Sequence, residues 1–130
     1  MILFTLDEAE ALLPQVRDEL VAMQACKREV DDLRGSFDHA AQKSAGNGHV
    51  KDEDALADKR RRAEALVQQI NERLARINEW GVELKGIDEG LIDFPSRRDD
   101  RVVYLCWRLG EDRIAWWHEI DAGFSGRQPL

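Results

Sequence analysis

Residues 102–120 read VVYLCWRLGEDRIAWWHEI, and this stretch decides the second half of the fold. Two runs rich in apolar residues, 102–109 and 113–120, flank a Gly-Glu pair, a pattern that predicts a β-hairpin. With a two-residue turn at that pair, Val103 is expected opposite His118. A turn longer by one residue would exchange the two faces of the hairpin. One face is predicted to carry Val103, Leu105, Trp107, Leu109, Ile114, Trp116 and His118.

The other face of this hairpin is neither fully polar nor fully apolar. It would hold Tyr104, Cys106, Arg108, Ala115, Trp117 and Glu119. A sheet with one covered face usually alternates apolar and polar residues, so two aromatic rings on the second face indicate that another surface packs there. A subunit interface is the simplest such surface, and we therefore expect a homodimer.

Two further strands are expected upstream of the hairpin. Residues 82–85 alternate, and the short apolar run 90–95 ends in a proline. Together these segments predict a small antiparallel sheet, a β-meander, over about residues 82–121. The tail 122–130 carries two glycines around Phe124, so we expect it to fold back, with Phe124 buried and Arg127 paired to a carboxylate.

The first half of the chain has helical periodicity. Thr5 and Glu8 form a capping box, which predicts a helix start. Apolar residues then follow at spacings of three and four up to Phe37, with Pro14 expected to kink the helix. The stretch 42–49 has no such periodicity and predicts a connection, and a second helix is expected from about Asp52 to just before Gly81. The result is a long antiparallel helical hairpin over about residues 5–80.

Length and charge set the outer limits. A chain of 130 residues suits one domain, 1–130, and the hairpin followed by a sheet packed on it gives the α+β class. The 19 basic and 26 acidic residues give a net charge of −7, which disfavours general nucleic-acid binding. Two cysteines without paired spacing argue against a disulfide framework. Without an export signal or a membrane-length apolar run, the cytoplasm is the expected location.

Three segments carry a family resemblance: FTLDEAEALLPQV near the start, ELKGIDEGLIDFP in the middle, and VVYLCWRLGEDRIAWWHEIDAGFSGRQPL at the end. With them the chain resembles the prokaryotic family DUF2203, a domain of unknown function. The most specific portion runs from Leu105 to Arg127. The resemblance implies an intact prokaryotic protein and implies no activity.

Several residues near the end of the chain are candidate ligands. A metal site would use His118 and Asp121, with Asp93 or Cys106 as further ligands from neighbouring strands. A small anionic ligand would be bound where Arg127 faces a cleft with His118 and Asp121. The alternative for His118 is a histidine hydrogen-bonded to a carboxylate or carbonyl at the end of the core.

Other chemistry is less well supported by the sequence. A nucleophilic cysteine would need Cys106, His118 and Asp93 together, but the predicted register separates Cys106 from His118. The acids of GIDEG, residues 86–90, suit turn chemistry. The basic run 59–62 lies among acids and suits a solvated helix face, with Asp58 paired to Arg62.

Two functions follow from these patterns. The first is a non-catalytic interaction or regulatory protein that acts as a homodimer, with an unidentified protein partner, no nucleic acid and no membrane. The second is a metal- or small-anion-binding protein, or a small hydrolytic enzyme, with a site around His118, Asp121, Asp93 and Arg127. The sequence requires neither a cofactor nor an enzymatic activity.

Overall fold

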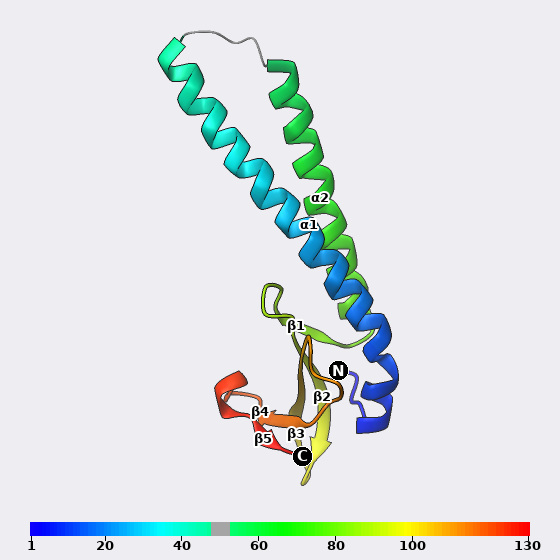
Figure 1. Ribbon diagram of the computed structural model, residues 1–130. Helices are drawn as coiled ribbons and strands as arrows, with labels where there is room; N and C mark the ends of the chain where they lie inside the picture. The colour runs from blue at the N-terminus through cyan, green and yellow to red at the C-terminus, as the bar shows by residue number, and fades with distance from the viewer. Residues whose placement is uncertain (48–52) are drawn as a thin grey trace. The chain divides into compact units, whose positions relative to one another are not determined.

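The computed structural model describes the backbone of residues 1–47 and 53–130. Side chains are described for residues 1–37 and 53–130. Two helices, α1 (Leu6–Asn47) and α2 (Glu53–Glu79), precede the strands, as Figure 1 shows. The strands are β1 (Glu83–Gly86), β2 (Leu91–Arg98), β3 (Arg101–Arg108), β4 (Trp116–Glu119) and β5 (Gln128–Pro129), with the short 3-10 helix η1 (Phe124–Gly126) before the last. They form one antiparallel sheet in the order β1-β2-β3-β4-β5. The α+β class is confirmed.

The contacts divide the chain into two compact units. One consists of Met1–Val21 together with Arg73–Leu130, and the other of Ala22–Glu72. The first unit therefore contains the start of α1, the end of α2 and the whole sheet. The organisation of 1–130 as one domain stays a prediction.

The second unit is a helical hairpin with its own apolar seam. Cys26, Val30 and Leu66 are buried there, and the partly buried Leu33 and Ile70 pack against them. Arg62 of α2 was expected to pair with Asp58. It instead donates to the Glu29 carboxylate of α1 at 2.9 and 3.1 Å. Asp58 instead pairs with Arg61.

The two ends of α1 differ in how well the sequence predicted them. The capping box is confirmed: the Thr5 hydroxyl accepts the Glu8 N–H at 3.1 Å, and the Glu8 carboxylate accepts the Thr5 N–H at 2.9 Å. The helix then continues through Pro14 to Asn47, ten residues past Phe37. The prediction that a connection begins at residue 42 is therefore wrong. An exposed helix can continue on the intrinsic helix propensity of its residues, without apolar periodicity. The rest of the predicted connection, residues 48–49, and the expected start of the second helix at Asp52 lie outside the described residues.

One face of the sheet packs against the start of α1 and carries the core of the first unit. The Phe4 ring meets the Phe94 ring edge-on at 5.4 Å, and the Arg17 guanidinium lies 5.5 Å from the Trp107 ring. The Ser96 hydroxyl donates to the Phe4 carbonyl at 2.6 Å. This helix-facing side includes Ile92, Phe94, Ser96, Val103, Leu105, Trp107 and Trp117. All seven are buried, with Trp107 fully so.

The predicted pairing of the hairpin at residues 102–120 is wrong by one residue. His118 lies opposite Tyr104, and Trp116 lies opposite Cys106. β4 begins only at Trp116, because the chain between β3 and β4 is a loop rather than a two-residue turn. In that loop the Glu111 carboxylate accepts the Arg108 N–H and the Glu111 carbonyl accepts the Trp107 indole N–H. The second face of the sheet therefore carries Tyr104, Cys106, Trp116 and His118 together.

The tail folds back as expected, but its aromatic ring is not buried. β5 pairs with β4, and the Leu130 N–H donates to the Ala115 carbonyl at 3.0 Å. Arg127 is paired with a carboxylate, as predicted, whereas Phe124 remains 41% exposed. Within the described residues, no helix combines the length and apolar character needed to cross a membrane.

Candidate metal-binding site

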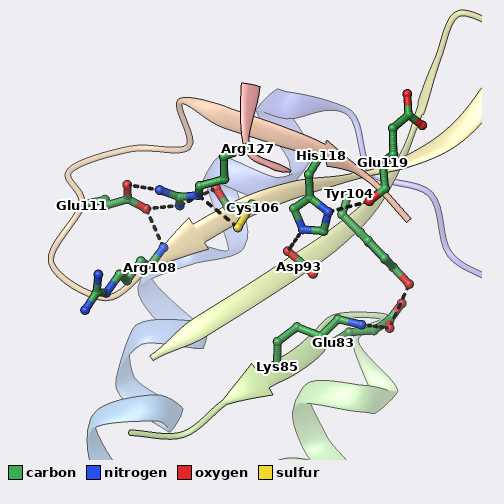
Figure 2. Close-up of polar contacts among 10 residues, drawn as sticks. All are labelled: Glu83, Lys85, Asp93, Tyr104, Cys106, Arg108, Glu111, His118, Glu119 and Arg127. Atoms are coloured by element: carbon green, nitrogen blue, oxygen red, sulfur yellow. Dashed lines mark hydrogen bonds and ion pairs between the residues drawn. The ribbon is translucent and has the colours of Figure 1, made fainter. Parts of the chain in front are cut away.

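Three different ligand types meet on the second face of the sheet. Asp93 lies on β2, Cys106 directly opposite it on β3, and His118 on β4, as Figure 2 shows. One ligand atom from each residue, a carboxylate oxygen, the Sγ and an imidazole nitrogen, lies within 4.8 Å of the other two. All three side chains are 2% exposed or less. Among the described residues, they form the one such group.

His118 is held by both ring nitrogens. Nδ1 lies 2.7 Å from the carbonyl oxygen of Glu119, and Nε2 lies 3.0 Å from Oδ1 of Asp93 (Figure 2). A carbonyl oxygen only accepts hydrogen bonds, so Nδ1 carries the proton and donates it. Nε2 then faces Oδ1 of Asp93. The prediction that His118 is hydrogen-bonded to a carboxylate or carbonyl is confirmed for both partners.

The two acidic members of the group are shifted toward their neutral forms. Burial raises the pKa of the Cys106 thiol to about 11, although Arg127 acts in the opposite direction. Burial also raises the pKa of Asp93, and the attraction of His118 offsets only part of that effect. Both shifts arise because a negative charge loses its hydration in this site.

Arg127 links the C-terminal tail to the thiol. Its Nε donates to Sγ of Cys106 at 3.3 Å, and its two terminal nitrogens bind the Glu111 carboxylate at 2.6 and 2.9 Å. The guanidinium also lies 4.5 Å from the Phe124 ring and 5.5 Å from the Trp116 ring. Burial alone would raise the pKa of Glu111, but the hydrogen bond from Arg127 and that from the Arg108 N–H together hold it below its usual value.

A second polar chain borders the group on the β1 side. The Tyr104 hydroxyl donates to the Glu83 carboxylate at 3.1 Å, and Lys85 donates to the same carboxylate at 3.0 Å (Figure 2). The Lys85 ammonium lies 4.7 Å from the Tyr104 ring, whose other neighbour is the His118 imidazole at 5.5 Å. No described buried side-chain N or O atom lacks a hydrogen-bond partner.

The geometry does not suit a nucleophilic cysteine, although the three residues that such a mechanism needs are together. A catalytic base must offer one ring nitrogen to the thiol and the other to its orienting acid. Here Nδ1 of His118 faces a backbone carbonyl and Nε2 faces Asp93. The thiol with a pKa of about 11 is also protonated near neutral pH.

The sequence-derived candidates divide into two groups. His118 and Asp93 lie side by side, and Arg127 contacts Cys106, the third member of the buried group. Asp121 follows β4 and is exposed, outside that group. The sequence analysis considered Cys106 as a further metal ligand and as a nucleophile, but the assumed turn placed it on the opposite face from His118. The polar character of the segment GEDR, residues 110–113, was the signal for a longer loop.

Comparison with known proteins adds a family. The description "Uncharacterized conserved protein (DUF2203)" matches residues 2–130. The chain belongs to the DUF2203 family. The match covers essentially the whole chain, including both helices and every strand. No curated protein and no solved structure is significantly similar to the chain.

Proposed function

We propose that this DUF2203 protein binds a divalent transition metal ion, with zinc as the best fit, through Asp93, Cys106 and His118. The observation that carries the proposal is the convergence of a carboxylate, a thiol and an imidazole from three adjacent strands, with ligand atoms within 4.8 Å of one another. With ordinary zinc bond lengths, two ligand atoms of one tetrahedral site lie about 3.3–3.6 Å apart. Small side-chain adjustments would bring the group to that spacing.

The surroundings of the group support metal binding in two ways. Metal-bound histidines usually donate their other ring N–H to a carbonyl or carboxylate, which is the role of Glu119 O toward Nδ1 of His118. The Arg127 Nε–H points at Sγ of Cys106, where it would stabilise a metal-bound thiolate. Both partners would orient the ligands before the ion arrives.

Charge balance favours a divalent ion. One thiolate and one carboxylate with a neutral imidazole carry two negative charges, which balance a divalent ion, and the neighbouring Arg127–Glu111 pair is itself neutral. Deprotonating a thiol with a pKa of about 11 at pH 7 costs about 5 kcal/mol. Metal binding would displace the thiol proton, so the affinity for the ion should rise with pH. A mixed S, N and O ligand set suits zinc better than magnesium or calcium, which prefer oxygen ligands.

Three protein ligands leave one tetrahedral position for a fourth ligand. In zinc enzymes that position holds water, which the ion activates. The hydrolytic activity considered from the sequence would require this arrangement, and it stays a prediction.

Cobalt(II) substitution tests the site directly. We expect the metal-free protein to bind one cobalt ion and to develop a thiolate-to-cobalt charge-transfer band together with the visible bands of a tetrahedral ion. Cys106→Ser should remove the charge-transfer band, and His118→Asn should weaken binding. The matched control is Cys26→Ser, because Cys26 is the other free cysteine and lies in the second unit.

The two cysteine variants distinguish Cys106 from Cys26 as the thiolate ligand. A charge-transfer band that persists in Cys106→Ser and disappears in Cys26→Ser would overturn the proposal, as would the absence of any tetrahedral cobalt spectrum in the wild-type protein. Circular dichroism of each variant would establish that the chain is folded when it is titrated.

A homodimeric interaction role is the second candidate. It is favoured by four exposed apolar side chains at the start of the chain, Met1, Ile2, Leu3 and Leu6, which are 83, 50, 37 and 39% exposed. Light scattering with size-exclusion chromatography should give the mass of two chains at micromolar concentration, and Ile2→Asp should shift it toward one. A single-chain mass for the wild type would contradict the dimer. Location in the prokaryotic cytoplasm remains part of this proposal.

A further inference from the structure

A pocket of about 310 Å³ lies on the second face of the sheet and takes no part in the proposed metal site. Its lining combines two cations, one anion and two apolar groups: Lys85, Arg108, Glu89, Leu91 and Phe124. Its volume is near the lower end of the range for small-molecule sites. We propose that this pocket binds a small monocarboxylate with an apolar or aromatic body.

The sheet register explains how these side chains come together. Leu91 on β2 lies opposite Arg108 on β3, and the neighbouring pair on the same face is Asp93, two residues after Leu91, with Cys106, two residues before Arg108. Side chains two apart on a strand share a face and are about 6.7 Å apart. The pocket therefore lies on the same face of the sheet as the buried Asp93–Cys106–His118 group. It is nevertheless built from different residues.

Arg108 is the strongest reason to expect an anion. Its guanidinium forms no hydrogen bond or ion pair with a side chain of the described residues, and it lies 5.8 Å from the Phe124 ring. Arg127, the other guanidinium near that ring, is already bound to Glu111. An arginine with a free planar fork matches the two oxygens of a carboxylate. Lys85 supplies a second cation, since its ammonium retains donors beyond the one that binds Glu83.

The other lining residues define the rest of the ligand. Phe124 is a large aromatic side chain that is 41% exposed, held at the pocket by the short helix η1. Together with Leu91 it offers an apolar surface on which a ring or short hydrocarbon chain would lose contact with water. Glu89 and the Glu83 carboxylate bound to Lys85 offset the two cations, so the site suits the single negative charge that Arg108 can bind better than a dianion such as phosphate.

Titration of the ¹⁵N-labelled protein with benzoate tests this assignment, with benzamide as the neutral analogue and inorganic phosphate as the dianion. Chelator is present throughout, so the result does not depend on metal binding. We expect saturable shifts for benzoate that are largest at the amides of Leu91, Arg108 and Phe124. Arg108→Gln should weaken binding about tenfold, the loss expected for one charge-assisted contact.

The matched control is Arg60→Gln, which removes the same charge from α2 in the second unit. It should leave benzoate binding unchanged. The proposal is overturned if benzoate gives no saturable shifts, if benzamide binds equally well, if phosphate binds and benzoate does not, or if the two arginine variants behave alike. Each of these outcomes leaves the cobalt experiment unaffected.

Discussion

Replacing Arg127 by methionine should destabilise the sheet unit far more than replacing Arg101, another ion-paired arginine of the sheet region. Arg127 makes two hydrogen bonds to Glu111, and the paired side chains are only 12 and 27% exposed. Arg101 binds Glu119, but those side chains are 45 and 34% exposed. Water and salt screen the second pair, so its loss should leave the unfolding midpoint almost unchanged.

The size of the Arg127 effect follows from its partners. Breaking a fully buried ion pair costs about 3–5 kcal/mol, and the partial exposure of this one reduces the figure to about 2 kcal/mol. Loss of the stacking on Phe124 and Trp116 adds about 0.5–1 kcal/mol, part of which methionine restores as an apolar side chain. We therefore expect Arg127→Met to lower the free energy of unfolding by about 2–3 kcal/mol.

Urea unfolding followed by tryptophan fluorescence measures this change. All four tryptophans, at positions 80, 107, 116 and 117, belong to the first unit, so the signal reports on that unit. Urea is uncharged and does not screen the ion pair. The Arg127→Met/Glu111→Gln double variant should lose less free energy of unfolding than the sum of the two single variants, by about 1 kcal/mol or more. Equal midpoints for Arg127→Met and Arg101→Met would refute the reasoning.

Three further outcomes are expected. In metal-free Cys26→Ser protein labelled with ¹³C at cysteine Cβ, the Cys106 resonance should titrate with a midpoint near pH 11, because burial of the thiol opposes ionisation; a midpoint below pH 9 would contradict the raised pKa. Ser96→Ala should lower the free energy of unfolding by about 1–2 kcal/mol, since it leaves the buried Phe4 carbonyl without this donor, whereas the exposed Ser125→Ala should be neutral in the same urea assay. Zinc at a hundredfold excess over its dissociation constant should stabilise the wild type by about 2.7 kcal/mol, and should stabilise His118→Asn much less.

The fold class was readable because each element carries a local signal. The capping box at Thr5 and Glu8 predicted the start of α1, and it forms as expected. The change from a helical period to alternation after Gly81 predicted where the sheet begins, and β1 starts at Glu83. These signals depend on residues within a few positions of one another, so they survive without knowledge of the tertiary structure.

The end of α1 and the strand around Pro95 were harder to predict, for physical reasons. Polar residues beyond Phe37 do not reveal whether an exposed helix continues. Pro95 suggested the end of a strand, yet β2 continues to Arg98. β1 pairs with β2 only from Leu91 to Asp93, so the missing N–H of Pro95 breaks no bond to β1.

Local periodicity was enough to predict the α+β class, the helical hairpin and the strand-rich second half. It also led to the grouping of His118, Asp121, Asp93 and Arg127, of which Asp121 lies outside the buried group. That Cys106 lies beside His118 and Asp93 follows only from the three-dimensional arrangement of the strands. The deciding quantity is the length of the loop after Arg108, because side chains alternate along a strand and a shift of one residue moves His118 to the opposite face. The local sequence predicts a hairpin but does not give the exact number of loop residues, which sets the face on which His118 lies. Glu111 and Arg127, sixteen residues apart, help hold the longer loop in place through a contact that no short-range pattern reveals.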